Sequence, residues 1–212
     1  MAKRNVATVK IREEVAALKR ERTLDAAVDL FYAKGYENTT LDEVADRLGM
    51  TKPFVYVNFG SKAELLAEIC LRGVQAAAQA LDAVLARRKG PRESLEAFAR
   101  DYVEAVLGVQ KHIAIYVREE KNLDSSDARR LGEMRREFFD KMTKLLERGA
   151  AAGEFDIDDA GLAALGIGGA VTWSTFWFRP DGRLSSPEIA ETMTKLLLGM
   201  AGARGGPRRV RA

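Results

Sequence analysis

The stretch that decides the fold is residues 40–59, TLDEVADRLGMTKPFVYVNF. It contains two short amphipathic segments on either side of Gly49. Thr40 is placed to cap the first segment, and Glu43 three residues later completes a capping box. Thr51 is placed to cap the second segment, and Pro53 falls in its first turn, where a missing N–H costs nothing. The spacing predicts two helices joined by a tight turn, which is a helix-turn-helix.

The two predicted helices have an inner and an outer face. Val44, Leu48 and Val55 are expected to form the buried wedge, and the small Ala45 allows the helices to cross closely. The side chains left to face outward carry hydrogen-bonding groups. The major groove of DNA is wide enough for one helix. The second helix of the pair is therefore expected to enter it, with outward residues Thr51, Lys52, Tyr56 and Asn58.

Helical periodicity continues on both sides of this motif. Apolar residues at three- and four-residue spacing predict a helix from about Arg12 to Lys34 that ends at Gly35. Further helices are predicted over residues 61–88, 92–108, 110–122, 126–151, 158–178 and 186–199, and strand patterns are nearly absent. The fold class is therefore all-α, with an N-terminal three-helix helix-turn-helix domain, a C-terminal helical domain and about nine helices in total.

The charge balance does not by itself indicate a nucleic-acid partner. The formal net charge is +3. Four arginines lie in the Gly/Pro-rich end of the chain, and without them the charge is 3 − 4 = −1. Residues 1–22 are locally basic, so residues 1–15 are interpreted as a basic arm, either a solvated tail or a minor-groove contact. DNA binding is thus inferred from the motif rather than from net charge.

Catalytic and metal-binding patterns are missing from the sequence. The single Cys70 excludes an intrachain disulfide and a multi-cysteine zinc site. His112 is the only histidine, and no motif pairs it with a nucleophile and an acid. We expect no enzyme activity, no cofactor and no metal. The start of the chain lacks the apolar segment of a signal peptide, and a cytoplasmic location is expected. Residues 160–178 are uncharged but rich in glycine and alanine, so a packing helix is favoured over a membrane span.

Residues 20–66 resemble the DNA-binding domain of the TetR family of repressors. The resemblance rests on Leu24-Asp25-Ala26-Ala27, Phe31, Lys34-Gly35-Tyr36, Thr39-Thr40, Val44-Ala45, Tyr56, Phe59-Gly60-Ser61-Lys62 and Leu65-Leu66. It implies phosphate contacts from Thr40, Thr51 and Lys62. It also implies a groove-facing surface made of Lys52, Pro53, Phe54, Tyr56, Val57 and Asn58. Pro53, Phe54 and Asn58 depart from the family's usual residues, so the operator sequence does not follow by analogy. Phe31, Tyr36 and Phe59 are expected in the core, and Tyr56 is either a core residue or a DNA contact.

Residues 113–198 resemble a TetR subgroup that regulates fatty-acid and steroid catabolism and commonly responds to acyl-CoA thioesters. The matching stretches are residues 117–123, 149–155 and 173–185. The resemblance implies an operator-bound repressor released by an effector such as an acyl-CoA. Candidate pocket residues are Val103, Leu107, Ile113, Tyr116, Phe138, Met142, Trp173 and Trp177, each of which is also a candidate core residue. Candidate partners for CoA phosphates are Arg118, Arg135 and Arg179, although residues 179–183 are equally interpretable as a turn at a dimer interface. Glu119 and Glu120 are expected on a solvated face or in an interhelical salt bridge.

The predicted organisation has four parts. They are a basic arm (1–15), a DNA-binding domain (16–66), a ligand-binding and dimerisation domain (67–201) and a disordered basic tail (202–212). A palindromic operator requires a two-fold dimer. The small-residue-rich helix 158–178 and helix 186–199 are expected to form the dimer interface. No membrane partner is expected. Two alternatives stay open: a TetR-type sensor of a drug or aromatic ligand, and a helical interaction protein without DNA binding.

Overall fold

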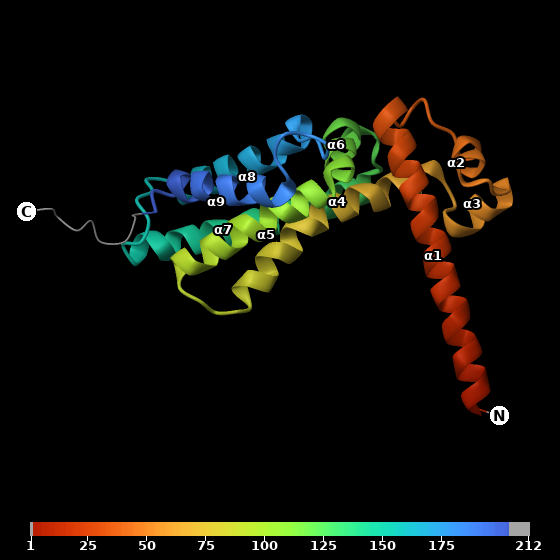
Figure 1. Ribbon diagram of the computed structural model, residues 1–212, viewed down its shortest axis with the longest axis horizontal. Helices are drawn as coiled ribbons and strands as arrows, with labels where there is room; N and C mark the ends of the chain where they lie inside the picture. Colours follow the sequence, from red (N-terminus) through yellow and green to blue (C-terminus); the bar gives the residue numbers. More distant parts are fainter. Residues whose placement is uncertain (1, 204–212) are drawn as a thin grey trace, which may run out of the picture. The chain divides into compact units, whose positions relative to one another are not determined.

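The computed structural model describes the backbone of residues 2–203 and the side chains of residues 12–203 (Figure 1), so most of the predicted disordered tail lies outside the described residues. Within that part of the chain there are helices and no strands, and the prediction of an all-α fold with about nine helices is confirmed. The elements are α1 (Ala2–Lys34), α2 (Leu41–Leu48), α3 (Lys52–Asn58), α4 (Lys62–Leu85), α5 (Pro91–Gly108), α6 (Gln110–Glu119), the 3-10 helix η1 (Glu120–Asn122), α7 (Ser125–Ala151), α8 (Ala160–Trp177) and α9 (Ser186–Met200).

The chain divides into two compact units. The first comprises Met1–Leu71 and Ala114–Ala128, and the second comprises Arg72–Ile113 and Arg129–Ala212. The first unit therefore contains α1 to α3 together with a distant segment of the sequence, the last part of α6 and η1. The predicted functional boundaries after residues 15, 66 and 201 stay a prediction.

The first unit is organised around the helix-turn-helix. Leu24, Ala27 and Phe31 of α1 are fully buried, as are Val44 of α2 and Val55 of α3. The predicted capping box at the start of α2 is present, with both hydrogen bonds formed. Gly49 ends α2 with φ 65°, in the left-handed region that favours glycine. Its N–H donates to the last turn of the helix, which produces the tight turn into α3.

Helix α1 is longer than the sequence predicts. It begins at Ala2 rather than near Arg12, and it extends well past α2 and α3 (Figure 1). No proline or glycine lies between Ala2 and Lys34, so nothing in the sequence stops the helix. The predicted start of this helix near Arg12 was wrong, and the role of residues 1–15 as a functional arm stays a prediction.

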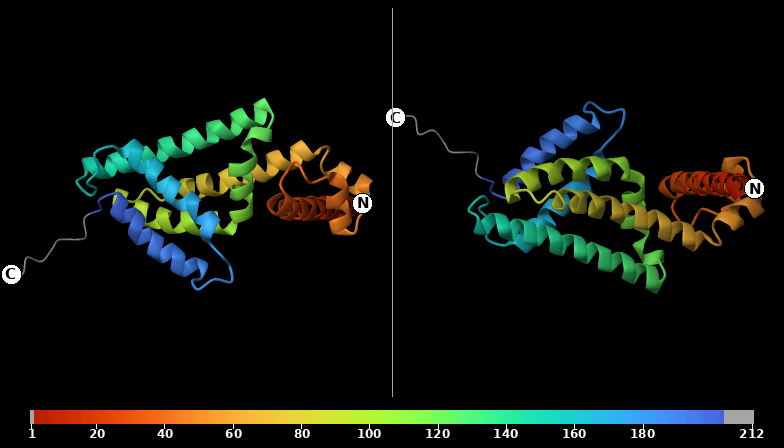
Figure 2. Two further views of the ribbon diagram at one scale, coloured as in Figure 1. Left: turned by 90° about the horizontal axis from the view of Figure 1, so that it is seen from above. Right: turned by 90° about the horizontal axis from the view of Figure 1, so that it is seen from below.

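The second unit is a helical bundle with one apolar core. Helix α5 packs against both α8 and α9 (Figure 2). Phe98 and Tyr102 of α5 stack with ring centroids 5.0 Å apart, and Phe138 of α7 packs 5.4 Å from Tyr102. Gly149 lets the chain fold back closely after α7, because a Cβ there would lie 2.0 Å from the Phe155 ring. None of the helices in the described residues is long and apolar enough to cross a membrane.

Candidate nucleic-acid interface

Helix α3 presents an outer face that the rest of the first unit leaves uncovered. Val55 is completely buried and anchors the helix, whereas Tyr56 is 52% exposed and Val57 is 85% exposed. Thr51 and Pro53 at the start of the helix are exposed as well. The Val57 side chain adds no hydrophobic stabilisation to the fold, because its apolar surface stays in water. The exposed side is therefore available for a partner.

Lys52 lies on this face and is tied to α2. Its ammonium group donates a hydrogen bond to the Asp42 carboxylate. This hydrogen bond and the charge of Asp42 raise the pKa of Lys52 above its ordinary value, so the side chain keeps its positive charge. Both groups are largely exposed, so the pair adds little stability. It holds the cation at the junction of the two helices.

Two predicted contact residues are turned back toward the protein. The Asn58 side-chain amide donates to the Phe54 carbonyl oxygen at 2.7 Å, within its own helix. Arg20 of α1 donates to the Asn58 carbonyl oxygen at 2.8 Å. Phe54 is half-buried, and the Lys19 ammonium lies 5.5 Å from the centre of its ring. These two side chains thus differ from Tyr56 and Val57, which point outward.

Thr40 and Lys62 both have structural partners. The Thr40 hydroxyl accepts the Glu43 N–H at 3.2 Å, and Glu43 accepts the Thr40 N–H at 2.9 Å. The hydrogen bond from Lys34 is the largest cause of the lowered pKa of Glu43. Lys62 donates to the Tyr36 carbonyl oxygen at 3.0 Å, with its ammonium 4.2 Å from the centre of the Tyr36 ring. Lys62 therefore fastens the loop between α1 and α2.

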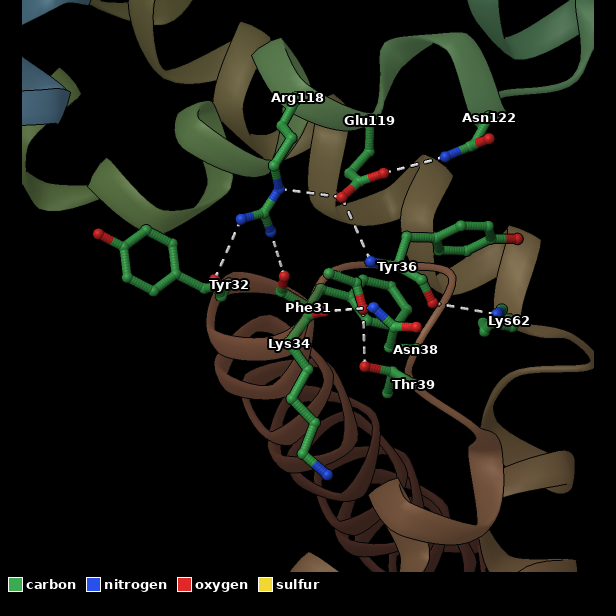
Figure 3. A network of polar contacts seen from close by, with 11 residues as sticks. Phe31, Tyr32, Lys34, Tyr36, Asn38, Thr39, Lys62, Arg118, Glu119 and Asn122 are labelled. Atoms are coloured by element: carbon green, nitrogen blue, oxygen red, sulfur yellow. Dashed lines mark hydrogen bonds and ion pairs between the residues drawn. The ribbon is translucent and has the colours of Figure 1, made fainter.

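A second set of contacts fastens the end of α1 from α6 (Figure 3). Arg118 donates to the carbonyl oxygens of Phe31 and, at 3.2 Å, of Tyr32. The buried Glu119 accepts from Arg118 at 2.9 Å and from the Tyr36 N–H at 3.3 Å. All of these residues belong to the first unit.

This network corrects part of the sequence interpretation. Glu119 is 6% exposed, so the predicted position of this residue on a solvated face was wrong. Arg118, a candidate partner for CoA phosphates, donates to carbonyl groups at the end of α1 in this structure, and its role toward CoA stays a prediction. The only sequence signal for this role is an Arg-Glu pair inside a helix, which is too common to be informative.

The predicted pocket residues fall into two groups. Six of them are buried, namely Val103, Leu107, Ile113, Tyr116, Phe138 and Met142. The other two are on the surface, Trp173 at 64% and Trp177 at 46% exposure. Their role in a ligand pocket stays a prediction. The two tryptophans occupy the outer side of α8, because Gly168 and Val171 take the buried side.

A cleft of about 220 Å³ opens between α4 and α7 in the second unit. Phe138 and Leu81 provide its apolar part, and Lys141 lies at its polar edge. Lys141 donates to Asp82 at 2.7 Å and pairs with Glu137 at 2.8 Å. Sequence reasoning placed only Phe138 here, since Gln75, Ala78 and Gln79 of α4 show no distinguishing pattern. Within the described residues, no group of three or more His, Cys, Asp or Glu side chains is arranged to hold a metal ion.

Two family models match this chain. Residues 24–69 match the family model described as bacterial regulatory proteins, tetR family. Residues 88–201 match the tetracyclin repressor-like, C-terminal domain, and this second match alone covers more than half of the chain. The chain belongs to the TetR family. Its helix-turn-helix is therefore a DNA-binding domain, and the protein is a ligand-responsive transcriptional repressor.

Several relatives share this TetR architecture over most of their length. The HTH-type transcriptional repressor KstR2 of Rhodococcus jostii (strain RHA1) is 28% identical over 182 residues, which is 85% of this chain and 89% of the relative. The TetR regulator PfmR from Thermus thermophilus has a TM-score of 0.77 and 29% identity, covering 88% of this chain and all of that one. AibR, solved in complex with isovaleryl coenzyme A and operator DNA, has a TM-score of 0.73 and 26% identity, covering 84% of this chain and 97% of that one.

Proposed function

We propose that this TetR regulator is a homodimer that binds its operator through α3 and is released by an acyl-CoA thioester. The DNA-binding domain would span residues 16–66, and the ligand-binding and dimerisation domain would span residues 67–201. The single observation that carries the proposal is the uncovered outer face of α3. The identity of the effector class rests on the similarity to AibR and on the cleft between α4 and α7.

The exposed residues of α3 are the ones proposed to reach the bases. Tyr56 supplies a hydroxyl, and Val57 supplies an apolar surface suited to a thymine methyl group. Thr51 and Lys52 are proposed as phosphate contacts, which set position without reading sequence. Thr40 and Lys62 are proposed as further phosphate contacts. For Lys62, a lysine ammonium has three donors, and its two carbonyl contacts need not use all of them. Pro53 completes the exposed part of the proposed surface, whereas Phe54 and Asn58 would have to turn outward to contribute to it.

The dimer interface is proposed on α8 and α9, which pack against each other in the second unit. Their outer sides expose Leu162 at 68%, Leu165 at 56% and Leu196 at 58%. Exposed leucines concentrated on two adjacent helices are typical of an association surface rather than of scattered surface residues. A second copy packed on this surface as a four-helix bundle would bury them.

The cleft between α4 and α7 is proposed as the entrance for the effector. Its inner wall is the Phe138 ring, which belongs to the aromatic cluster of the core. The rim carries Lys141 with two acidic partners, so its net charge does not attract a phosphate. We therefore infer that the acyl chain, and not the nucleotide end, enters here. Entry requires the side chains around Phe138 to move, because the cleft is too small for a whole ligand.

The effector assignment can be tested with DNA from upstream of the protein's own gene. A mobility shift would be titrated with isovaleryl-CoA, longer acyl-CoA thioesters, the matching free acids and coenzyme A alone. We expect release by a thioester only. Release by the free acid alone, or by none of these ligands, would contradict the assignment while leaving the repressor itself intact.

A matched pair of variants locates the ligand. Ala78→Trp fills the cleft from α4 and should abolish release without weakening operator binding. Ala83→Trp makes the same substitution on an exposed position of α4 that does not line the cleft, so it should respond like the wild type. Equal responses from the two variants would place the effector elsewhere.

A further inference from the structure

The long α1 helix forms a groove with the recognition helix α3. Residues 12–19 of α1 are all exposed, so the fold of the first unit does not cover them. The groove has a volume of about 560 Å³ and runs between Arg12, Val15 and Lys19 on one side and Pro53, Phe54 and Val57 on the other. Both walls belong to the first unit.

The groove is positively charged. Residues at positions i, i+3 and i+7 share one face of a helix, so Arg12, Val15 and Lys19 point the same way. Glu13 and Glu14 lie on other faces of α1, and no acidic side chain of the described residues lines the groove. Arg12 and Lys19 are two turns apart, about 10 Å along the axis. They are therefore spaced to reach separate negative groups.

The middle of the groove is apolar. Val57 is 85% exposed and Val15 is 44% exposed. An apolar strip with a cation at each end suits a chain that alternates anionic groups with rings that present C–H edges. The sugar–phosphate backbone of DNA is such a chain.

Arg20 fixes the position of α1 relative to α3, and thereby the position of the groove. Arg20, on a neighbouring face of α1, donates to the Asn58 carbonyl at the end of α3, and its guanidinium stacks 4.0 Å from the centre of the Phe59 ring. Glu64 and Glu68 lie 3.8 and 3.5 Å from the same guanidinium. Arg20 is thus neutralised and structural, which leaves Arg12 and Lys19 as the cations of the groove.

We propose that the groove between α1 and α3 seats one strand of the DNA at the edge of the major groove, with Arg12 and Lys19 as additional phosphate contacts. The inference rests on the proposed role of α3, because the groove continues directly from the face that would enter the major groove. Residues 12–19 thereby become a second DNA-contacting element outside the helix-turn-helix. Its contribution is independent of base sequence.

The test is the salt dependence of binding, measured by fluorescence anisotropy on the upstream fragment that the wild-type protein shifts. The double variant Arg12→Gln/Lys19→Gln would be compared with Arg87→Gln/Lys89→Gln, which removes the same charge from the second unit. Each lost phosphate contact should reduce the slope of log K against log salt by about 0.9. We expect a reduction of about 1.8 and an affinity loss on the order of tenfold at 0.15 M salt, equal on operator and unrelated DNA. The control should match the wild type.

The outcomes separate this inference from the function on which it rests. A wild-type protein that binds no upstream DNA would refute the role of α3. Wild-type binding with an unchanged slope in the Arg12/Lys19 variant would overturn the inference alone. So would an affinity loss confined to the operator, since phosphate contacts do not read sequence. The melting temperature should change little, because both side chains are exposed and only the contact of Lys19 with the Phe54 ring is lost.

Discussion

The reactivity of the Cys70 thiol should depend on whether the protein is folded. Cys70 is fully buried, and burial raises the pKa of its thiol to about 12. The reactive thiolate is therefore scarce at pH 8 in the folded protein. We expect an aromatic disulfide reagent to label the native protein far more slowly than the protein in denaturant, where one thiol should react at once. Equal rates in the two conditions would show that Cys70 is accessible.

Glu119 is the residue whose removal should cost the first unit most among its polar side chains. It is 6% exposed and accepts hydrogen bonds from Arg118, the Tyr36 N–H and Asn122. Glu119→Ala leaves the Tyr36 N–H without this acceptor, at a cost of about 1–3 kcal/mol in the free energy of unfolding. Denaturant titration measures it. The exposed Glu133→Ala serves as the control, and an equal effect from both would contradict the network of Figure 3.

At the scale of elements, the start of α2 should make stability depend on pH. The Lys34 hydrogen bond, followed by the Thr40 N–H, lowers the pKa of Glu43 below its ordinary value of 4.5. A lowered folded-state pKa stabilises the protein above the unfolded-state pKa, and the gain is lost as the pH falls through the folded-state value. The stability difference between wild type and Glu43→Gln should therefore be constant above the ordinary value of 4.5 and shrink as the pH falls through the lowered folded-state pKa. Lys34→Gln should move that loss to higher pH. A stability difference between wild type and Glu43→Gln that does not depend on pH would contradict the capping box.

The elements that were predictable are those decided by neighbours in the sequence. The capping box at Thr40 and the turn at Gly49 depend on residues within one helical turn, so the sequence was sufficient for them. The start of α1 was predicted too late, because a helix without a stop signal has no local boundary. The burial of Glu119 and the exposure of Trp173 depend on partners far away in the chain, and no local pattern encodes them. The same holds for Asn58, which turns back to its own helix.

At the scale of the whole molecule, the dimer is the assembly to test. Leu165 is 56% exposed on α8, and in the proposed interface Leu165→Glu would bury a carboxylate among apolar side chains. Light scattering should report a mass near 23.4 kDa for this variant, the mass of one chain, and twice that for the wild type. Operator affinity should fall together with the dimer. Lys144→Glu, exposed on α7, should remain dimeric, and a dimeric Leu165→Glu would move the interface away from α8.

The outer face of α3 is proposed to read the operator sequence. The most direct measurement is the affinity of wild type, Tyr56→Phe and Tyr56→Ala for the upstream fragment and for a scrambled duplex of equal length. We expect the wild type to prefer the upstream fragment and Tyr56→Ala to lose about 1–3 kcal/mol of this preference, with little change in affinity for scrambled DNA. Tyr56→Phe separates the hydroxyl from the ring. Equal affinity of the wild type for both duplexes, or an unaltered preference in Tyr56→Ala, would contradict this proposal.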